Sequence, residues 1–376
     1  MTNTSIQVNI PNGWQRVKLG DVATITNGKT NTQDAVADGE YPLFDRSVSI
    51  KHSNKYLFDG TAIILPGEGA DFVPRFFSGK FDLHQRTYAI FPKEQADATF
   101  LFQNLYANRE VFAKNAVGST VKSLRLPIIQ AVDVLLPTLS EQKKIAEILG
   151  AVDEEIAKTD EIIAVTEELK RGLMRTLLGK GTKVKLGEIA SIVRGGSPRP
   201  IDNFITEDPD GLNWLKIGDI ESGAKYITHT SQKIKKEGLS KTTLVRAGDF
   251  ILSNSMSFGR PYIMKTEACI HDGWLAFRDV KADLVDKEFL YYLLISEKLQ
   301  DNFRSVAAGS GVKNLKKESV ANISVSLPSV TEQKEIAAIL SSVDEKVVAN
   351  QQFKAALELL KRGLMQDLLS GKKRTV

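Results

Sequence analysis

The segment LPTLSEQKKIAEILGAVDEE, which begins at Leu136, returns as LPSVTEQKEIAAILSSVDEK from Leu327, an offset of 191 residues. The likeness continues without a gap to KRGLMRTLL, which starts at Lys170, and KRGLMQDLL, which starts at Lys361. About half of the aligned positions are identical. A repeat of this length indicates that a structural unit is duplicated within the chain.

Apolar residues in both copies recur with the heptad spacing of helices that pack in a coiled coil. We expect one long helix over residues 137–180 and another over 328–376, paired antiparallel because the second helix leads only to the chain end. Thr159 and Asn350 lie at equivalent places near mid-helix, where a polar pair could fix the register. The predicted seam consists of Ile145, Ile148, Val152, Thr159, Ile162, Leu169 and Leu173, and of Ile336, Ile339, Val343, Asn350, Phe353, Leu357, Leu360 and Leu364.

The starts of both helices are marked in the sequence. Thr138 with Glu141, and Ser329 with Glu332, have capping-box spacing just after a proline. At about 1.5 Å per residue, a helix of about 38 residues is on the order of 55 Å long. We therefore expect the helices to act as a ruler between the domains.

A second repeat lies outside these helices. VKLGDVATITNGKT from Val17 resembles VKLGEIASIVRGGS from Val184, and AVGSTVKSL from Ala116 resembles AAGSGVKNL from Ala307. The offset grows from 167 to 191 residues, so the second domain holds about 24 more residues. The predicted order is a domain over 1–136, a helix, a domain over 181–327 and a helix. The predicted class is α+β, with two pseudo-two-fold-related globular α/β domains separated by an antiparallel two-helix coiled coil.

The composition, 42% hydrophobic and 26% charged residues, is typical of a soluble globular protein. The N-terminal sequence lacks a basic start with an apolar core, and no stretch approaches the roughly 18 apolar residues of a membrane span. We expect a cytoplasmic protein without a membrane partner. Cys269 is the one cysteine, which excludes a disulfide and a cysteine-based zinc site within the chain, and we expect it to be buried.

The net charge is spread thinly over both domains. Residues 11–136 carry 14 Lys and Arg against 13 Asp and Glu, and residues 183–327 carry 21 against 18, giving +1 and +3. A protein that coats DNA without specificity should be more basic, whereas one that reads DNA with a few placed residues and a partner need not be.

Motifs for nucleotide binding and catalysis are incomplete. Gly28-Lys29-Thr30 matches the end of a phosphate-binding P-loop, but Ala23 stands where the first glycine is required. Structurally this is a turn between strands; functionally its lysine could hold a DNA phosphate, and the sequence leaves both readings open. Glu141 and Glu332 imitate part of a nuclease motif without an acidic partner. No metal site is predicted from the scattered histidines His52, His84, His229 and His271.

The order and duplication of these motifs resemble a type I restriction-modification specificity subunit over nearly the whole chain. The first domain departs at YPLFDRSVSI, from Tyr41, where the second has WLKIGDI, from Trp214. The features that carry the resemblance are the two helix-entry segments, KRGLM twice, Trp14 with Leu19–Val22, SNSMSFGR from Ser253 and CIHDGW from Cys269.

This resemblance implies that each domain reads one half of a split double-stranded DNA target. It implies that the helices dock two methyltransferase subunits and help to recruit nuclease and translocase subunits. The chain lacks the cofactor loop and the Asn/Asp-Pro-Pro-aromatic motif of an adenine methyltransferase. We therefore expect no catalytic residue and no cofactor here, with S-adenosylmethionine, ATP and Mg²⁺ bound by the partner subunits.

Base reading requires polar and basic side chains in loops, aimed at base edges. Arg86 and Arg260 are the favoured base readers, whereas Lys122 and Lys313, which follow matching Gly-Ser turns, are predicted phosphate anchors. The predicted DNA-binding residues are Lys29, Arg46, His84, Gln85, Arg86 and Lys122 in the first domain, and Arg194, Arg199, Lys216, Ser253, Asn254, Arg260, Lys313 and Lys316 in the second.

Three other functions stay open at this point. A subunit of a methyltransferase-only complex would lack an accompanying nuclease. An autonomous nuclease would cleave DNA with magnesium and lose this activity in Glu141→Ala. A coiled-coil scaffold would not bind DNA even with partners present. The sequence of the DNA target and its spacer length cannot be derived from the chain.

Overall fold

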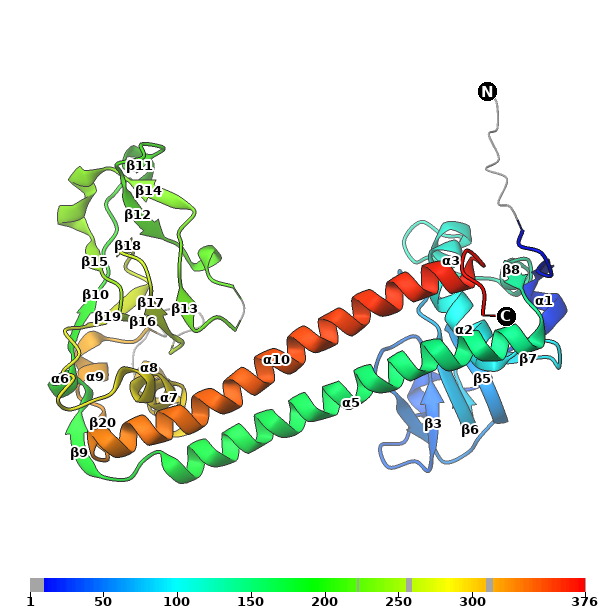
Figure 1. Cartoon of the computed structure of the whole chain (residues 1–376), viewed down its shortest axis with the longest axis horizontal. Coiled ribbons are helices and arrows are strands. Elements are labelled where there is room, and N and C mark those ends of the chain that lie inside the picture. Colours follow the sequence, from blue (N-terminus) through cyan, green and yellow to red (C-terminus); the bar gives the residue numbers. More distant parts are fainter. Residues whose placement is uncertain (1–9, 222, 255–258, 309–313, 376) are drawn as a thin grey trace. The chain divides into compact units, whose positions relative to one another are not determined.

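The structure is a computed structural model that describes residues 10–221, 223–254, 259–308 and 314–375. It divides into two compact units, Met1–Glu161 with Gln351–Val376 (unit 1) and Ile162–Asn350 (unit 2). Each unit contains one globular domain and parts of both long helices (Figure 1). The predicted class of two mixed α and β domains with long helices is confirmed. No helix among the described residues is long and apolar enough to cross a membrane.

Domain 1, the globular part of unit 1, is built on one six-stranded sheet in the order β2-β7-β5-β6-β3-β4. Only β3 and β6 pair in parallel; the other neighbours are antiparallel. β1 and β8 form a separate antiparallel pair. The strands are β1 (Gln15–Lys18), β2 (Ala23–Asn27), β3 (Tyr41–Phe44), β4 (Lys51–Ser53), β5 (Phe58–Pro66), β6 (Arg75–Leu83), β7 (Thr87–Pro92) and β8 (Asp133–Leu136), and the helices are α1 (Leu19–Val22), η1 (Thr32–Asp34), α2 (Ala98–Ala107), α3 (Glu110–Asn115) and α4 (Leu126–Gln130).

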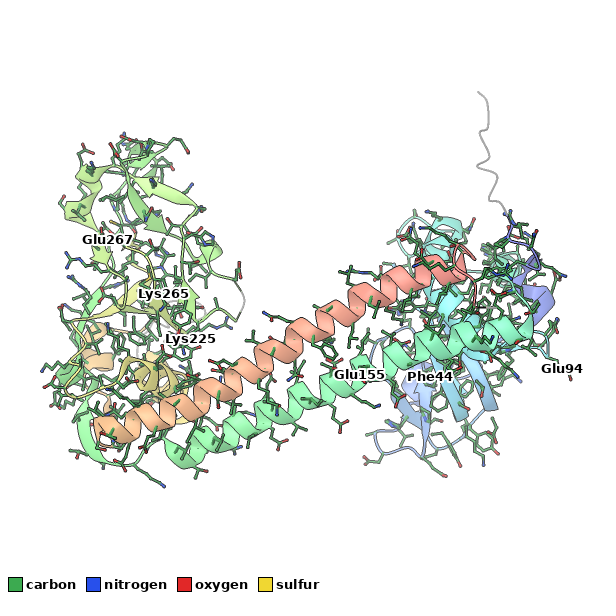
Figure 2. All side chains as sticks on the ribbon, viewed as in Figure 1. Phe44, Glu94, Glu155, Lys225, Lys265 and Glu267 are labelled. Atoms are coloured by element: carbon green, nitrogen blue, oxygen red, sulfur yellow. The ribbon has the colours of Figure 1, made fainter. Side chains whose placement is uncertain are left out.

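The centre of the sheet of domain 1, in the second half of β5 and in β7, carries buried residues on both faces. Ile63 and Ile90 pack in the main core with residues of α2 and α4. Phe44, at the end of β3 (Figure 2), belongs to a second cluster that contains Phe81 and Phe77. Burial on both faces fixes the sheet, so the loops at its ends are held on a rigid base.

Domain 2, in unit 2, contains two five-stranded sheets, β10-β19-β16-β17-β13 and β11-β14-β12-β18-β15, with β9 and β20 as a separate pair. The strands are β9 (Thr182–Lys185), β10 (Ser191–Arg194), β11 (Ile205–Thr206), β12 (Leu212–Leu215), β13 (Tyr226–Ile227), β14 (Gln232–Ile234), β15 (Thr243–Val245), β16 (Phe250–Ser253), β17 (Pro261–Met264), β18 (Ala268–Ile270), β19 (Trp274–Arg278) and β20 (Ser324–Leu327), and the helices are α6 (Leu186–Ile189), η2 (Ile201–Asn203), η3 (Ile217–Asp219), η4 (Lys236–Lys241), α7 (Lys287–Ile295), α8 (Glu297–Ala308) and α9 (Lys317–Ala321).

The two domains share one plan, which differs because two neighbouring strands of domain 1 are each divided in domain 2. In domain 1, β6 is continuous and pairs with β5 along one part and with β3 at its end. In domain 2, β17 pairs with β16, and β18 pairs with β12 in a different sheet. The β5–β6 pair of domain 1 therefore corresponds to the β16–β17 and β15–β18 pairs, which lie in separate sheets. β14 pairs with β12 as β4 pairs with β3, so β11 and β13 are the strands that domain 2 adds. Cys269 in β18 is fully buried, as predicted.

The long helices are α5 (Leu139–Leu177) and α10 (Val330–Leu369). In unit 1, Lys361 pairs with Asp153 at 2.5 Å and Lys354 pairs with Asp160 at 2.6 Å. The numbers rise on one helix as they fall on the other, so the helices are antiparallel. In unit 2 the equivalent ion pair joins Lys170 to Asp344 at 2.5 Å.

The seam between the helices is shifted by one residue from the prediction at several places. Ile145, Val152 and Leu173 are buried or half-buried as predicted, but six predicted seam residues are exposed: Ile148, Ile162, Leu169, Ile339, Phe353 and Leu360. The inward positions alternate by three and four residues, as in a coiled coil. They are Ile145, Leu149, Val152, Ile156, Thr159, Ile163, Thr166, Lys170, Leu173 and Leu177 on α5, and Ile336, Leu340, Val343, Val347, Asn350, Lys354, Leu357, Lys361, Leu364 and Leu368 on α10.

The polar seam residues do not form the predicted register contact. The Thr159 hydroxyl donates to the Glu155 carbonyl at 2.7 Å, and the Asn350 amide donates to the Lys346 carbonyl at 2.8 Å. Each side chain therefore donates its hydrogen bond to a backbone carbonyl of its own helix. The interhelical polar contacts come from the lysine–aspartate pairs instead.

The two helix starts, which look alike in sequence, differ in structure. Ser329 and Glu332 form the complete capping box. At the start of α5, the backbone N–H of Glu141 donates to the Thr138 hydroxyl at 3.4 Å. The buried Glu141 carboxylate instead accepts from Arg374 at 2.7 Å and from the Trp14 indole at 3.2 Å. The guanidinium competes successfully for the carboxylate, and it holds the pKa of Glu141 below its ordinary value.

Candidate nucleic-acid interface

Four loops of domain 1 meet at one end of its sheet, and we call them loop cluster 1. They contain residues 28–30 after β2, 67–69 after β5, 84–86 between β6 and β7, and 122–124. Backbone hydrogen bonds join them: Lys29 N to Leu83 O at 3.1 Å, Gly67 N to Arg86 O at 2.9 Å, and Leu124 N to Gly67 O at 2.8 Å. Because the loops bond to one another, their side chains are held in a fixed arrangement.

Domain 2 repeats this framework, here called loop cluster 2. Gly196 N donates to Ile270 O at 3.1 Å, Asn254 N to Gly273 O at 2.9 Å, and Leu315 N to Asn254 O at 3.1 Å. These bonds are the equivalents of the three in domain 1. Each domain therefore presents the same backbone scaffold at the same end of its sheet.

The repeated glycine of each cluster is required by close backbone approach. A Cβ atom on Gly28 would lie 1.9 Å from the Leu83 carbonyl oxygen, and one on Gly195 would lie 2.0 Å from the His271 carbonyl oxygen. No side chain can be accommodated at either place.

Gly28-Lys29-Thr30 forms a turn whose geometry does not suit a phosphate-binding P-loop. The N–H groups of Lys29 and Thr30 both donate to Leu83 O, so they cannot hold a phosphate. The Thr30 hydroxyl is buried and donates to Asp82 at 2.7 Å. Only the exposed Lys29 side chain remains free to reach outward.

In loop cluster 1 a single carboxylate gathers two predicted arginines. Glu68 accepts from Arg86 Nη1 at 2.6 Å and lies 3.8 Å from Arg46 Nη1. Glu68 is 15% exposed, whereas the two arginine side chains are more than 60% exposed. The guanidinium groups are thus oriented from one side and keep other donors open to solvent, as bidentate contact with a base requires.

In loop cluster 2 the equivalent role falls to Asp272. Its carboxylate accepts from Ser197 Oγ at 2.7 Å and lies 3.4 Å from Arg199, and its carbonyl accepts from Arg194 Nε at 3.0 Å and Asn254 Nδ2 at 3.1 Å. The hydrogen bond from Ser197 holds the pKa of Asp272 below its ordinary value. The carboxylate is therefore charged at neutral pH and faces Arg199, whereas Arg194 is held by the backbone carbonyl.

Two histidines occupy equivalent places in the clusters. His84 Nδ1 accepts from Arg86 N at 3.1 Å, and His271 Nδ1 accepts from Gly273 N at 2.9 Å. Burial lowers the pKa of both rings, so the neutral imidazole is the acceptor that each turn needs. His84, predicted to bind DNA, has this nitrogen engaged in supporting the turn.

The other predicted residues of domain 1 also lie at loop cluster 1. Gln85 Nε2 donates to Asn31 Oδ1 at 2.6 Å. The carbonyl of Lys122 accepts from Gly69 N, while its exposed amine donates to Ala113 O at 3.1 Å. All six predicted residues of this domain are therefore brought together.

In domain 2, Ser253 Oγ accepts from the backbone N–H of Arg260, whose side chain is exposed. Lys316 follows Leu315 and is also exposed. Lys216 lies one residue beyond the β12–β18 pair, in a shallow hollow with Asp219 and His229. The predicted Lys313 lies outside the described residues.

Sequence reasoning missed the two acidic residues that organise the clusters. The available signal was position: Glu68 stands between two glycines directly after a buried strand, and Asp272 occupies the turn equivalent to Gln85. Among the residues that the structure describes, no group of three or more His, Cys, Asp and Glu could hold a metal ion. The chemical groups that both clusters present to solvent are oriented arginine side chains, which donate hydrogen bonds.

The sequence matches the Type I restriction modification DNA specificity domain twice, over residues 11–167 and 180–359. The chain belongs to this family. The MjaVIII specificity subunit of Methanocaldococcus jannaschii is 25% identical over 401 residues, which cover 96% of this chain and 93% of that protein. The EcoDI specificity subunit of Escherichia coli is 25% identical over 366 residues, which cover 87% and 80%.

Solved structures of this family have the same fold. The crystal structure of the S subunit from M. genitalium matches with a TM-score of 0.65 and 15% identity over 98% of both chains. A chain from a study of assembly and conformational transition of the type I R-M system matches with a TM-score of 0.60 and 17% identity, over 96% of this chain and 98% of that one. The specificity subunit is thus a two-domain protein of the predicted family.

Proposed function

We propose that this specificity subunit reads a split double-stranded DNA target, one half with each domain, within a type I restriction-modification complex. The observation that carries the proposal is that loop clusters 1 and 2 share a backbone scaffold but differ in the side chains they present. Domain 1 offers Arg46 and Arg86 around Glu68, and domain 2 offers Arg194 and Arg199 around Asp272. One scaffold with two donor sets suits two different half-sequences.

The helices supply docking surfaces for two equivalent partners. In unit 1, Ile148, Phe353 and Leu360 are 39%, 48% and 50% exposed. Their repeat equivalents in unit 2, each 191 residues away, are also exposed: Ile339, Ile162 and Leu169. Each unit therefore presents one matched apolar set.

The placement of these sets in the heptad supports docking. Each of the six residues comes one position before an inward residue, at the heptad position called g in a coiled coil. In an antiparallel pair the g positions of the two helices lie on the same side of the seam. The opposite flank is occupied: Asp153 accepts from Gln103 of α2, and Asp344 accepts from Tyr292 of α7. The free flank with its apolar stripe is the surface for the methyltransferase subunits, one per unit.

The reaction chemistry belongs to the partners in this proposal. The chain itself is not an enzyme. S-adenosylmethionine is bound by the two methyltransferase subunits, and ATP and Mg²⁺ are bound by nuclease and translocase subunits. The domains carry net charges of only +1 and +3, so partners also supply much of the attraction for DNA phosphates. A complex in the cytoplasm, where its DNA substrate is accessible, fits these roles.

The test is selection of bound duplexes from a random library by the subunit in complex with its methyltransferase. Two conserved blocks separated by an unconserved spacer are expected. Arg86→Ala should alter one block and Arg260→Ala the other, each by about 1–3 kcal/mol of discrimination. A single continuous block, or equal relaxation of both blocks by either variant, would contradict the proposal.

A further inference from the structure

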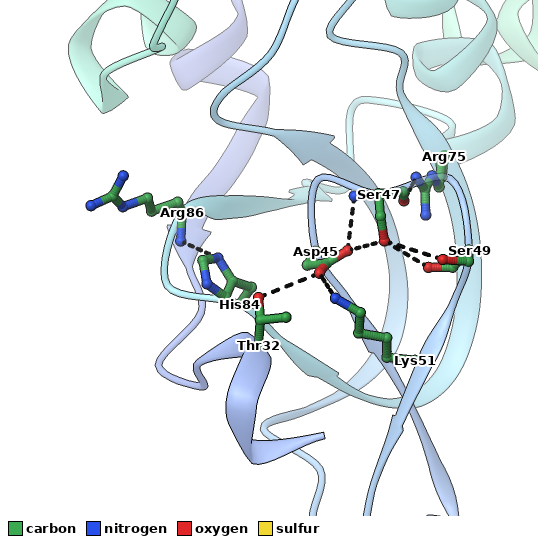
Figure 3. A network of polar contacts seen from close by, with 8 residues as sticks. All are labelled: Thr32, Asp45, Ser47, Ser49, Lys51, Arg75, His84 and Arg86. Carbon is green, nitrogen blue, oxygen red and sulfur yellow. Dashed lines mark hydrogen bonds and ion pairs between the residues drawn. The ribbon is translucent and has the colours of Figure 1, made fainter. Parts of the chain in front are cut away.

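The loop between β3 and β4 of domain 1 is anchored from within (Figure 3). Asp45, which is buried, accepts from Ser47 N at 2.8 Å, from Ser47 Oγ at 2.5 Å and from Lys51 Nζ at 2.5 Å. These bonds tie the start of the loop to its middle and to its end. A loop of this length is thereby held in one conformation.

Further contacts brace the same loop. The Ser47 hydroxyl, which donates to Asp45, also lies 3.0 Å from Ser49 O, and Arg75 of β6 donates to the carbonyl of Ser47. Burial alone would raise the pKa of Asp45, but the hydrogen bonds from Lys51 and Ser47 outweigh it and lower the pKa to about 2. The central carboxylate is therefore charged at neutral pH.

At the tip of this braced loop stands Val48, which is 92% exposed. It is the most exposed of the large hydrophobic residues in the part of the chain that the structure describes. A single exposed valine on a floppy loop would be ordinary. A valine displayed by a loop with buried anchors is instead pre-ordered for contact, because little conformational entropy is lost when it meets a ligand.

The surroundings of Val48 indicate which ligand. Its near neighbour Arg46 faces Glu68, which also binds Arg86, so the loop extends loop cluster 1. Figure 3 shows the Thr32 hydroxyl 3.5 Å from Asp45 and, as a separate contact, the Arg86 N–H donating to His84. An exposed valine two residues after Arg46, in a loop that Glu68 joins to Arg86, suits a ligand that carries both acceptors and a small apolar group.

We propose that Val48 is a specificity-determining residue that contacts the 5-methyl group of a thymine in the half-target read by domain 1. In the major groove the thymine methyl is the apolar group that side chains can recognise, and guanine offers paired acceptors to arginine. The inference rests on the proposed function, since it assumes that loop cluster 1 faces DNA. In domain 2 the chain after β12 instead turns into η3, where Ile217 is 53% exposed.

The experiment measures methylation rates of the complex on its selected duplex and on duplexes in which deoxyuridine replaces each thymine in turn. With wild-type protein, one replacement in the domain 1 half should slow methylation about threefold to fivefold, because one methyl contact is lost. Val48→Ala should slow the unmodified duplex about tenfold. In Val48→Ala that same replacement should have no further effect, since the contact is already gone.

Control variants separate recognition from folding. Val48→Ile keeps the apolar tip and should retain the wild-type rate. Val165→Ala removes an equally plain exposed valine from α5, at 60% exposure, and should change nothing. Asp45→Asn releases the anchor and should reduce the deoxyuridine effect while leaving the domain 2 half unchanged.

The outcomes are decisive in both directions. If the wild-type complex selects no two-block target, the proposed function fails and the inference with it. If it selects such a target, but Val48→Ala methylates at the wild-type rate, or slows without losing its sensitivity to deoxyuridine, the proposed function stands and the thymine contact is refuted.

Discussion

Truncation to alanine is expected to affect stability at one residue of α5 and partner binding at its neighbour. Leu149 is fully buried in the seam, whereas Ile148, one position earlier, is 39% exposed on the free flank. Leu149→Ala and Ile148→Ala each remove a similar volume of apolar side chain. The difference between them therefore reports on position rather than on chemistry.

The magnitudes follow from burial. Leu149→Ala should lower the free energy of unfolding by about 2–5 kcal/mol, as for other buried leucines. In a unit of roughly 150–250 residues, each kcal/mol shifts Tm by about 2–4 °C, so a fall of about 4–20 °C is expected. Ile148→Ala should change stability by no more than about 0.5 kcal/mol. It should instead weaken methyltransferase docking about tenfold, because its apolar surface is covered there.

Thermal unfolding of the isolated subunit and titration with purified methyltransferase measure these two effects. Leu340→Ala and Ile339→Ala are the matched pair in unit 2, with Leu340 fully buried and Ile339 44% exposed. They should repeat the pattern at the second docking site. If Ile148→Ala destabilises the subunit as much as Leu149→Ala, or leaves docking unchanged, the division into seam and docking flank is incorrect.

Three further outcomes are expected. Glu141→Ala should destabilise unit 1 by about 2–3 kcal/mol by calorimetry, because it leaves Arg374 without its carboxylate, whereas Glu332→Ala, at an exposed cap, should cost much less; equal losses would argue against the Arg374 contact. The pKa values of His84 and His271 are lowered in the folded state, so their contribution to stability should be complete above the ordinary pKa of 6.5. It should decline as pH falls below 6.5, because the unfolded state then binds more protons. Replacing both with asparagine should make Tm less dependent on pH between about pH 7 and pH 5, and an unchanged dependence would contradict this reasoning. The subunit alone should bind DNA weakly and with little specificity, and nanomolar sequence-specific binding in a gel-shift assay at physiological salt would refute this.

The long helices show how far a repeat can be interpreted without coordinates. Their existence, their extent and their antiparallel pairing follow from the duplicated heptads. The phase of the seam does not, because α5 carries two apolar stripes one residue apart, and spacing alone cannot tell which stripe packs inside. Lys170 occupies an inward position although it is charged, so a search for apolar residues does not find it. Its partner Asp344 lies 174 residues away in the chain and becomes apparent only in the structure.

The loop clusters show the same boundary. Basic residues in loops beside strand ends were identifiable, and all six in domain 1 converge. The choice of Gly28 and Gly195 is explained only by carbonyl oxygens that approach from distant strands. The roles of Glu68 and Asp272 could not be predicted, because the sequence does not show that an acidic residue in such a loop contacts arginines from other loops.

The measurement that tests the central claim most directly is a map of methylated adenines in cells that co-express this subunit with its methyltransferase. The account predicts one split motif with a methylated adenine in each half. In Glu68→Gln, which removes the charge that orients Arg46 and Arg86, only one half of that motif should change, and in Asp272→Asn only the other half. A motif without a spacer, or a variant that alters both halves together, would contradict the reading of one half by each domain.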